Sequence, residues 1–128
     1  MRTQSKDGRP VNLDLGTIKF PITALGSISH RVSGVILFFS SFVLLWALDV
    51  SLSSEAGFEA ITSATDSFWG KAIAWSISTS LTYHALAGIK HLIMDLGIGE
   101  TMRGGKIGAT SVFMISGILS VLWLIILW

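Results

Sequence analysis

The sequence of 128 residues lacks cysteine and is poor in charge. Without cysteine the chain can form no disulfide, no thiolate metal site and no cysteine-ligated iron–sulfur cluster. Charged residues make up 13% of the chain, whereas a typical soluble domain has about 25%. The net charge of +1 argues against nucleic-acid binding, and no glycine-rich phosphate loop, hydrolase elbow or enzymatic carboxylate pair is present. Since 51% of the residues are hydrophobic, the chain is interpreted as an integral membrane protein.

Three long apolar stretches dominate the chain. The stretch 20–48 carries Arg31 as its only formal charge, and the stretches 72–89 and 107–128 carry none. A helix of about 17 to 25 apolar residues can cross the hydrocarbon core of a bilayer, so each stretch is long enough. We therefore predict an all-α integral membrane protein with three transmembrane helices, in which residues 1–128 form a single membrane-anchor domain. The spans are expected at approximately 21–49, 68–93 and 105–128.

Basic residues are unevenly distributed between the expected loops, and their distribution predicts the orientation. The loop 50–66 contains no lysine or arginine, whereas the N-terminal tail and the second loop are basic. Because cytoplasmic loops are enriched in lysine and arginine, we expect the N-terminus on the cytoplasmic side and the C-terminus on the periplasmic side. The serine-, threonine- and glutamate-rich segment 51–66 fits either a short interfacial helix or an irregular loop.

The first apolar stretch carries three polar residues, Ser27, His30 and Arg31. Helical offsets of three and four residues place Ser27 on the same side as the other two. An ionisable residue inside a bilayer costs a few kcal/mol or more, so it usually has a partner and a function. No aspartate or glutamate lies at a matching depth in this chain, so Arg31 is expected to bind an anion from elsewhere. The alternative is an arginine satisfied by backbone carbonyls.

The second apolar stretch carries His84, with Gly88 one turn later and His91 two turns later on the same face. His84 is expected at about the depth of His30 and Arg31. A mid-membrane imidazole followed by a glycine that leaves room for a flat ring suits an axial ligand of haem iron. Arg31 then offers the paired donors that a haem propionate needs. The alternative is a histidine that hydrogen-bonds a serine of a neighbouring helix and serves helix association only.

These residues fall into two sequence blocks. The first runs from Arg9-Pro10 to Ser27-x-x-His30-Arg31-x-Ser33-Gly34, and the second is His84-x-x-x-Gly88-Ile89-Lys90-His91-x-x-x-Asp95-x-Gly97. Both resemble the cytochrome b membrane-anchor subunit of succinate dehydrogenase (complex II, succinate:quinone oxidoreductase), proteobacterial type, and the resemblance covers nearly the whole chain. One departure is Lys90, where the family pattern usually has arginine. The charge is kept, but the bidentate fork of donors is lost.

The resemblance implies roles for the intramembrane residues. His84 matches the axial ligand to the iron of one haem b, whose opposite ligand is a histidine of the companion anchor subunit. Ser27 and Arg31 match residues that bind the substrate ubiquinone. His30 and Arg31 match positions close to the haem propionates, and His91 is a further candidate there. Hydrogen bonds from Ser27 and Arg31 to a quinone carbonyl oxygen would stabilise the negative charge that develops during reduction.

The resemblance also implies partners and a location. Succinate oxidation belongs to a flavoprotein subunit and an iron–sulfur subunit that dock on the cytoplasmic side, so no catalytic residue is expected in this chain. We expect it beside a second hydrophobic anchor subunit and lipid, as a multi-pass protein of a bacterial inner membrane, because no transit peptide is evident. Two alternatives stay open: an anchor of another haem b quinone oxidoreductase, such as a fumarate reductase, and a haem-free structural anchor.

Overall fold

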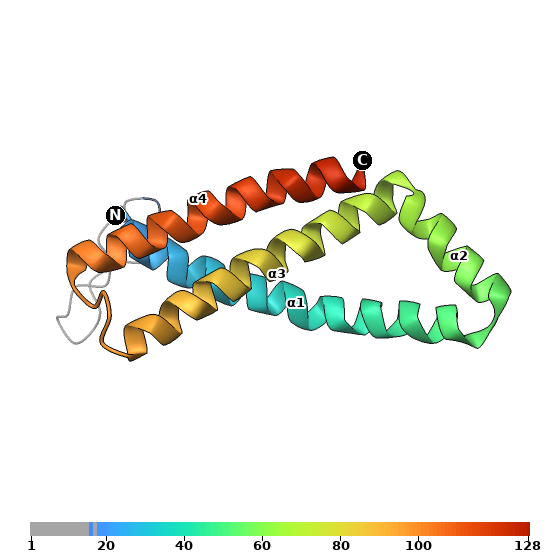
Figure 1. Ribbon diagram of the computed structural model, residues 1–128, viewed down its shortest axis with the longest axis horizontal. Coiled ribbons are helices and arrows are strands. Elements are labelled where there is room, and N and C mark those ends of the chain that lie inside the picture. Colours follow the sequence, from blue (N-terminus) through green and yellow to red (C-terminus); the bar gives the residue numbers. More distant parts are fainter. Residues whose placement is uncertain (1–15, 17) are drawn as a thin grey trace, which may run out of the picture.

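The computed structural model describes Gly16 and residues 18–128, which form four helices and no strand. The helices are α1 (Ile22–Ser53), α2 (Glu55–Asp66), α3 (Phe68–Asp95) and α4 (Met102–Leu127). In Figure 1 α1 and α4 run in one direction and α3 runs in the opposite direction between them in the chain. The short α2 joins the end of α1 to the start of α3. The start of α1 therefore lies at the same end of the molecule as the α3–α4 connection. The all-α prediction is confirmed for the described part of the chain.

Short polar residues determine where three of the helices begin. Ser54, Ser67 and Thr101 each accept a hydrogen bond from the backbone N–H three residues later, at 3.0–3.1 Å. Such caps satisfy an N–H that has no partner within its own helix. The cap at Ser54 separates α2 from α1, so the segment 51–66 contains the end of one helix and the whole of a second. Of the two interpretations of this segment, the short helix is the one observed.

The long helices differ in polarity. By length and composition, α1 and α4 are apolar enough to cross a membrane. Helix α3 has 28 residues, a comparable length, but hydroxyl and histidine side chains lie along it and lower its apolar content.

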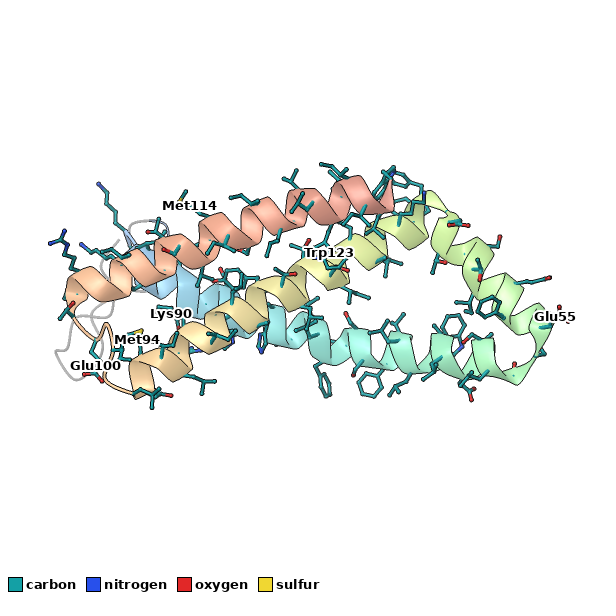
Figure 2. The ribbon with its side chains drawn as sticks, viewed as in Figure 1. Glu55, Lys90, Met94, Glu100, Met114 and Trp123 are labelled. Atoms are coloured by element: carbon teal, nitrogen blue, oxygen red, sulfur yellow. The ribbon has the colours of Figure 1, made fainter. Side chains whose placement is uncertain are left out.

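Large apolar side chains on α1 are not covered by other described residues; Phe38, Phe39 and Phe42 are 58–63% exposed. Figure 2 shows side chains of this kind projecting from α1. Apolar exposure on this scale marks a lipid- or partner-facing surface. The single-domain arrangement and the span boundaries stay predictions.

The core lies where α1, α3 and α4 meet. The residues that α4 buries are mostly small and recur at helical spacing: Gly105, Ala109, Val112 and Ser116. Small side chains let helix backbones approach closely, which is the usual basis of helix association in membranes. Tyr83 of α3 packs into this core and donates a hydrogen bond to the Gly26 carbonyl of α1 at 3.0 Å. This bond fixes α3 against α1 one residue before His84.

Candidate functional site

Three histidines from two helices converge beside the core. The ring of His30 on α1 stacks on the ring of His84 on α3, with centroids 4.2 Å apart and planes inclined by 25°. The ring of His91, two turns further along α3, lies 5.1 Å from that of His30. The spacing argument placed His84 and His91 on one face and His30 at a similar depth. The fold brings all three together.

The Nδ1 atom of His84 faces two hydrogen-bonding groups on α1. The Ser33 hydroxyl oxygen lies 3.1 Å from it, and the His30 backbone carbonyl oxygen lies 3.2 Å from it. A carbonyl oxygen can only accept, so this contact requires the proton of His84 on Nδ1. Nε2 then carries the lone pair, and it makes no hydrogen bond with any described residue. A neutral imidazole in this tautomer can bind a metal ion through Nε2.

Two glycines lie beside the imidazole rings, and one of them, Gly34, approaches a ring closely. A Cβ added at Gly34 would lie 3.1 Å from Cε1 of His84, closer than ordinary van der Waals contact. A Cβ added at Gly88 would lie 3.8 Å from Nε2 of His30. The sequence predicted that Gly88 leaves room for a flat ring, and the ring beside it in the structure is the His30 imidazole. Gly34 has the tighter contact, because the α1 backbone passes directly against His84.

Two ring nitrogens of the histidine cluster are buried without a partner. Nε2 of His30 and Nδ1 of His91 have no hydrogen bond within the described chain. Burying an unsatisfied polar atom costs about 1–3 kcal/mol, so such atoms usually mark the place of a ligand, ion or water. Together with Nε2 of His84, they give three imidazole nitrogens of one cluster that have no partner among the described residues. This donor set fits a haem, with His84 toward the iron and the other two histidines toward polar substituents.

Ser27 and Arg31 lie one helical turn apart on α1, and neither is engaged by the rest of the described chain. Ser27 is half-buried, Arg31 is exposed, and neither side chain hydrogen-bonds to a described residue. No described carboxylate pairs with Arg31. The interpretation of Arg31 as satisfied by backbone carbonyls therefore finds no support among these residues. Among the described residues, neither side chain has a partner that a ligand or another subunit would have to displace.

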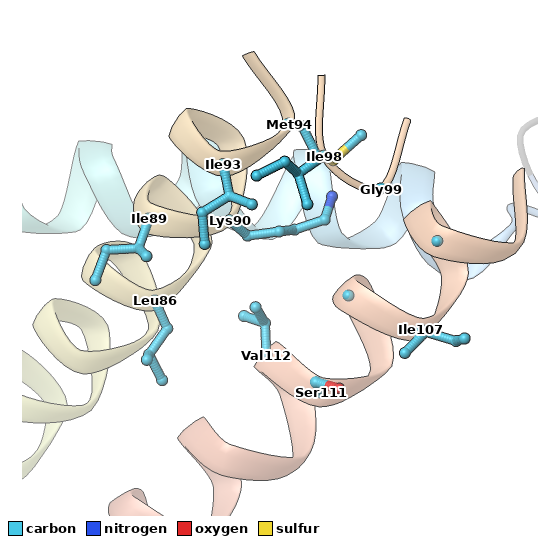
Figure 3. A pocket seen from close by; sticks show the side chains of 12 residues that line it. Leu86, Ile89, Lys90, Ile93, Met94, Ile98, Gly99, Ile107, Ser111 and Val112 are labelled. Atoms are coloured by element: carbon cyan, nitrogen blue, oxygen red, sulfur yellow. The ribbon is translucent and has the colours of Figure 1, made fainter. Parts of the chain in front are cut away.

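Lys90 lies on a different side of α3 from the histidine stack. Figure 3 shows its side chain extending along a groove between α3 and α4, with Ile93 and Ile98 close by. The groove is open to one side, has a volume of about 360 Å³ and is lined largely by apolar side chains. The Lys90 stem passes Gly108 of α4, where an added Cβ would lie 3.2 Å from its Cε. Lys90 thus packs against α4, and the substitution of the usual arginine falls outside the stack of imidazole rings.

Sequence reasoning gave no role to three residues that shape the site. Ser33 and Gly34 stood within the first motif, and Tyr83 directly precedes His84 in the second apolar stretch. The helical offsets used for Ser27 could have drawn attention to Ser33, which follows His30 by three residues. The contact of Ser33 with His84 depends on how α1 and α3 are rotated, which local spacing does not determine.

Comparison with known proteins identifies the family. The model of the succinate dehydrogenase/fumarate reductase transmembrane subunit family matches residues 5–123. The chain is 37% identical over 121 residues to the succinate dehydrogenase cytochrome b556 subunit of Coxiella burnetii, covering 94% of this chain and 97% of the relative. It is 28% identical over 126 residues to the protein of that name from Paracoccus denitrificans, covering 98% of this chain and 97% of the relative. It is 30% identical over 114 residues to that of Rickettsia felis, covering 89% of both chains.

The family match covers both sequence blocks, the whole of α1 and α3, and α4 as far as residue 123. The resemblance predicted from the two blocks is thereby confirmed, including its proteobacterial character. This chain belongs to the succinate dehydrogenase/fumarate reductase transmembrane subunit family.

Proposed function

We propose that this chain is the haem b-bearing membrane-anchor subunit of a succinate dehydrogenase. It would hold the flavoprotein and iron–sulfur subunits at a bacterial inner membrane and help to form the site of ubiquinone reduction. The observation that carries the proposal is the placement of His84, whose Nδ1 faces the Ser33 hydroxyl and the His30 carbonyl of α1 while Nε2 has no partner among the described residues. The names of the relatives, cytochrome b556 subunits of succinate dehydrogenase, support the same function.

His84 would bind the iron, and the haem would supply a one-electron redox centre within the membrane. The propionates would be bound by Arg31, His30 and His91. Arg31 is cationic, and Nε2 of His30 and Nδ1 of His91 lack a hydrogen-bond partner in the described chain. The stacking of His30 on His84 favours one iron ligand from this chain. The two rings lie face to face 4.2 Å apart, so His84 alone would hold the iron and His30 would lie beside it. A companion anchor subunit would therefore supply the second ligand.

Ser27 and Arg31 would form this chain's part of the quinone site. Their positions one turn apart allow a hydroxyl and a guanidinium to hydrogen-bond to one quinone carbonyl oxygen. A preorganised cation beside this oxygen stabilises the negative charge that develops on reduction more than it stabilises the neutral quinone. Neither side chain has to break an existing hydrogen bond to a described residue first.

The proposed membrane arrangement has α3 as a third span between α1 and α4. Its length and antiparallel packing support this assignment, and its hydroxyls find partners within the bundle: Thr79, for example, lies 2.9 Å from Ser120 of α4. The N-terminus and the α3–α4 connection would face the cytoplasm, since Lys19, Lys90 and Arg103 belong to that end of the bundle. The two soluble subunits would dock on the same side.

The proposed quinone role is tested by Arg31→Leu in the assembled four-subunit complex. We expect electron transfer from succinate to ubiquinone to fall about a hundredfold, the scale seen when one preorganised donor is removed. Succinate oxidation with a soluble artificial acceptor should persist, because it needs only the soluble subunits. Both rates are measured on the same preparation, together with its subunit content.

Arg103→Leu is the matched control, because it removes an exposed guanidinium from the same end of the bundle. It should leave both rates at the wild-type level. Equal loss of both activities in Arg31→Leu would indicate failed assembly. Unchanged quinone reduction in an intact Arg31→Leu complex would contradict the proposed site.

A further inference from the structure

Ser33 is buried between α1 and α3, with 5% of its surface exposed, and it makes two contacts through one oxygen. Its hydroxyl donates to the His30 backbone carbonyl of its own helix at 2.8 Å. The same oxygen lies 3.1 Å from Nδ1 of His84 on α3. It is therefore the side-chain hydroxyl from α1 that faces the proposed iron ligand.

The direction of the second bond follows from proton counting. A serine hydroxyl has one proton, and here that proton is used on the His30 carbonyl. Its remaining lone pairs can accept, so the bond to His84 runs from the imidazole N–H to the serine oxygen. Because the hydroxyl already donates to a carbonyl, the bonds form a chain in which each polarises the next. The α1 backbone at Gly34 lies beside the same edge of the ring, since a Cβ added there would be 3.1 Å from Cε1.

We propose that Ser33 is a positioning residue for the haem iron ligand His84. Together with the His30 carbonyl, its oxygen holds the proton on Nδ1, fixes the ring orientation and makes Nε2 a stronger electron donor. Such partners of a metal-bound histidine orient it and raise its basicity. A more basic ligand stabilises the oxidised iron, so Ser33 lowers the haem midpoint potential. This inference rests on the proposed ligation by His84.

Ser33→Ala in the assembled complex tests the inference by redox titration of the haem and by haem content. We expect a higher midpoint potential and about tenfold weaker haem retention, the lower end for such partners because the His30 carbonyl remains. Ser40→Ala is the matched control. Ser40 is also a buried serine of α1 whose hydroxyl bonds a carbonyl of its own helix, at 2.8 Å, but it contacts no histidine. It should keep the wild-type potential and haem content.

Ser33→Thr and Ser33→Val form a second pair that keeps the test decisive if the alanine variant fails to assemble. Threonine and valine have nearly the same shape, so both bring the same extra methyl group and only threonine keeps the hydroxyl. We expect Ser33→Thr to have the lower potential of the two. Equal potentials in this pair, or a Ser33→Ala complex with the properties of wild type or of Ser40→Ala, would overturn the inference.

His84→Leu is measured in parallel, so that the two proposals can fail separately. If it leaves the haem spectrum unchanged, the iron ligand lies elsewhere and the proposed function of His84 fails, together with the role of Ser33. If it abolishes the spectrum while the Ser33 variants match their controls, only the positioning role of Ser33 fails.

Discussion

The two ends of this molecule differ in how closely their helices pack and in whether they bury side chains. At the converged end, which we define as residues 22–34, 83–95 and 102–113, α1, α3 and α4 meet. At the splayed end, residues 41–66, α1 leaves α3 and α2 spans the gap (Figure 1). The converged end contains buried serine, alanine, valine and tyrosine side chains, whereas no residue of the splayed end is buried. Apolar content alone makes a segment able to enter a bilayer, but small and hydrogen-bonding residues bring helices close enough to form a site.

The largest loss of stability is expected from a substitution that adds volume to the converged end. Ala87 of α3 is 3% exposed, so Ala87→Leu forces three extra carbon atoms into a close helix contact. We expect a loss of about 1–3 kcal/mol in the stability of the assembled complex, because extra volume in a tight core requires backbone movement. Ala85→Leu places the same side chain two residues away on an exposed position of α3. The two melting temperatures are compared in one detergent, and equal values would contradict the account of the converged end.

A smaller and more local effect is expected from Gly34→Ala. The new Cβ would press on Cε1 of His84 at 3.1 Å, so the ring must shift by a few tenths of an ångström. We expect an altered haem spectrum and a changed midpoint potential with little change in overall stability. Replacing a helical glycine by alanine favours the helix by about 1 kcal/mol, which offsets part of the contact cost.

Gly117→Ala shares the gain in helix stability but meets no neighbour within 4 Å. The difference between the two variants therefore isolates the contact with His84. Identical haem spectra and potentials in both would mean that the close approach of α1 does not constrain this histidine.

Much of this architecture could be predicted from the sequence because its signals are local. Long apolar stretches predicted the long helices, and helical offsets placed His84, Gly88 and His91 on one face. Whether 51–66 is a helix or a loop was left open, since its composition fits both. The structure shows the deciding features, an N-cap at Ser54 and an acidic residue, Glu55, in the first turn. Both favour a helix start.

The contacts of the site could not be predicted, because they depend on how two distant segments are rotated against each other. The pairing of Ser33 with His84 joins residues 51 positions apart, and a different rotation of α1 would present another residue to that ring. Lys90 is a similar case. Helical periodicity places it on a different side of α3 from His84 and His91, but its contact with Gly108 of α4 follows from helix packing. Local periodicity determines a face, and tertiary packing determines what that face meets.

The measurement that tests the central claim most directly is the reduced-minus-oxidised spectrum of the assembled complex with His84→Leu, beside wild type and His91→Leu. If His84 binds the iron through its free Nε2, the α-band of haem b is lost or shifted in His84→Leu. The band persists in His91→Leu, which removes another imidazole from the same face of α3. An unaltered band in His84→Leu would contradict the account and move the iron ligand to another residue, with His30 the next candidate.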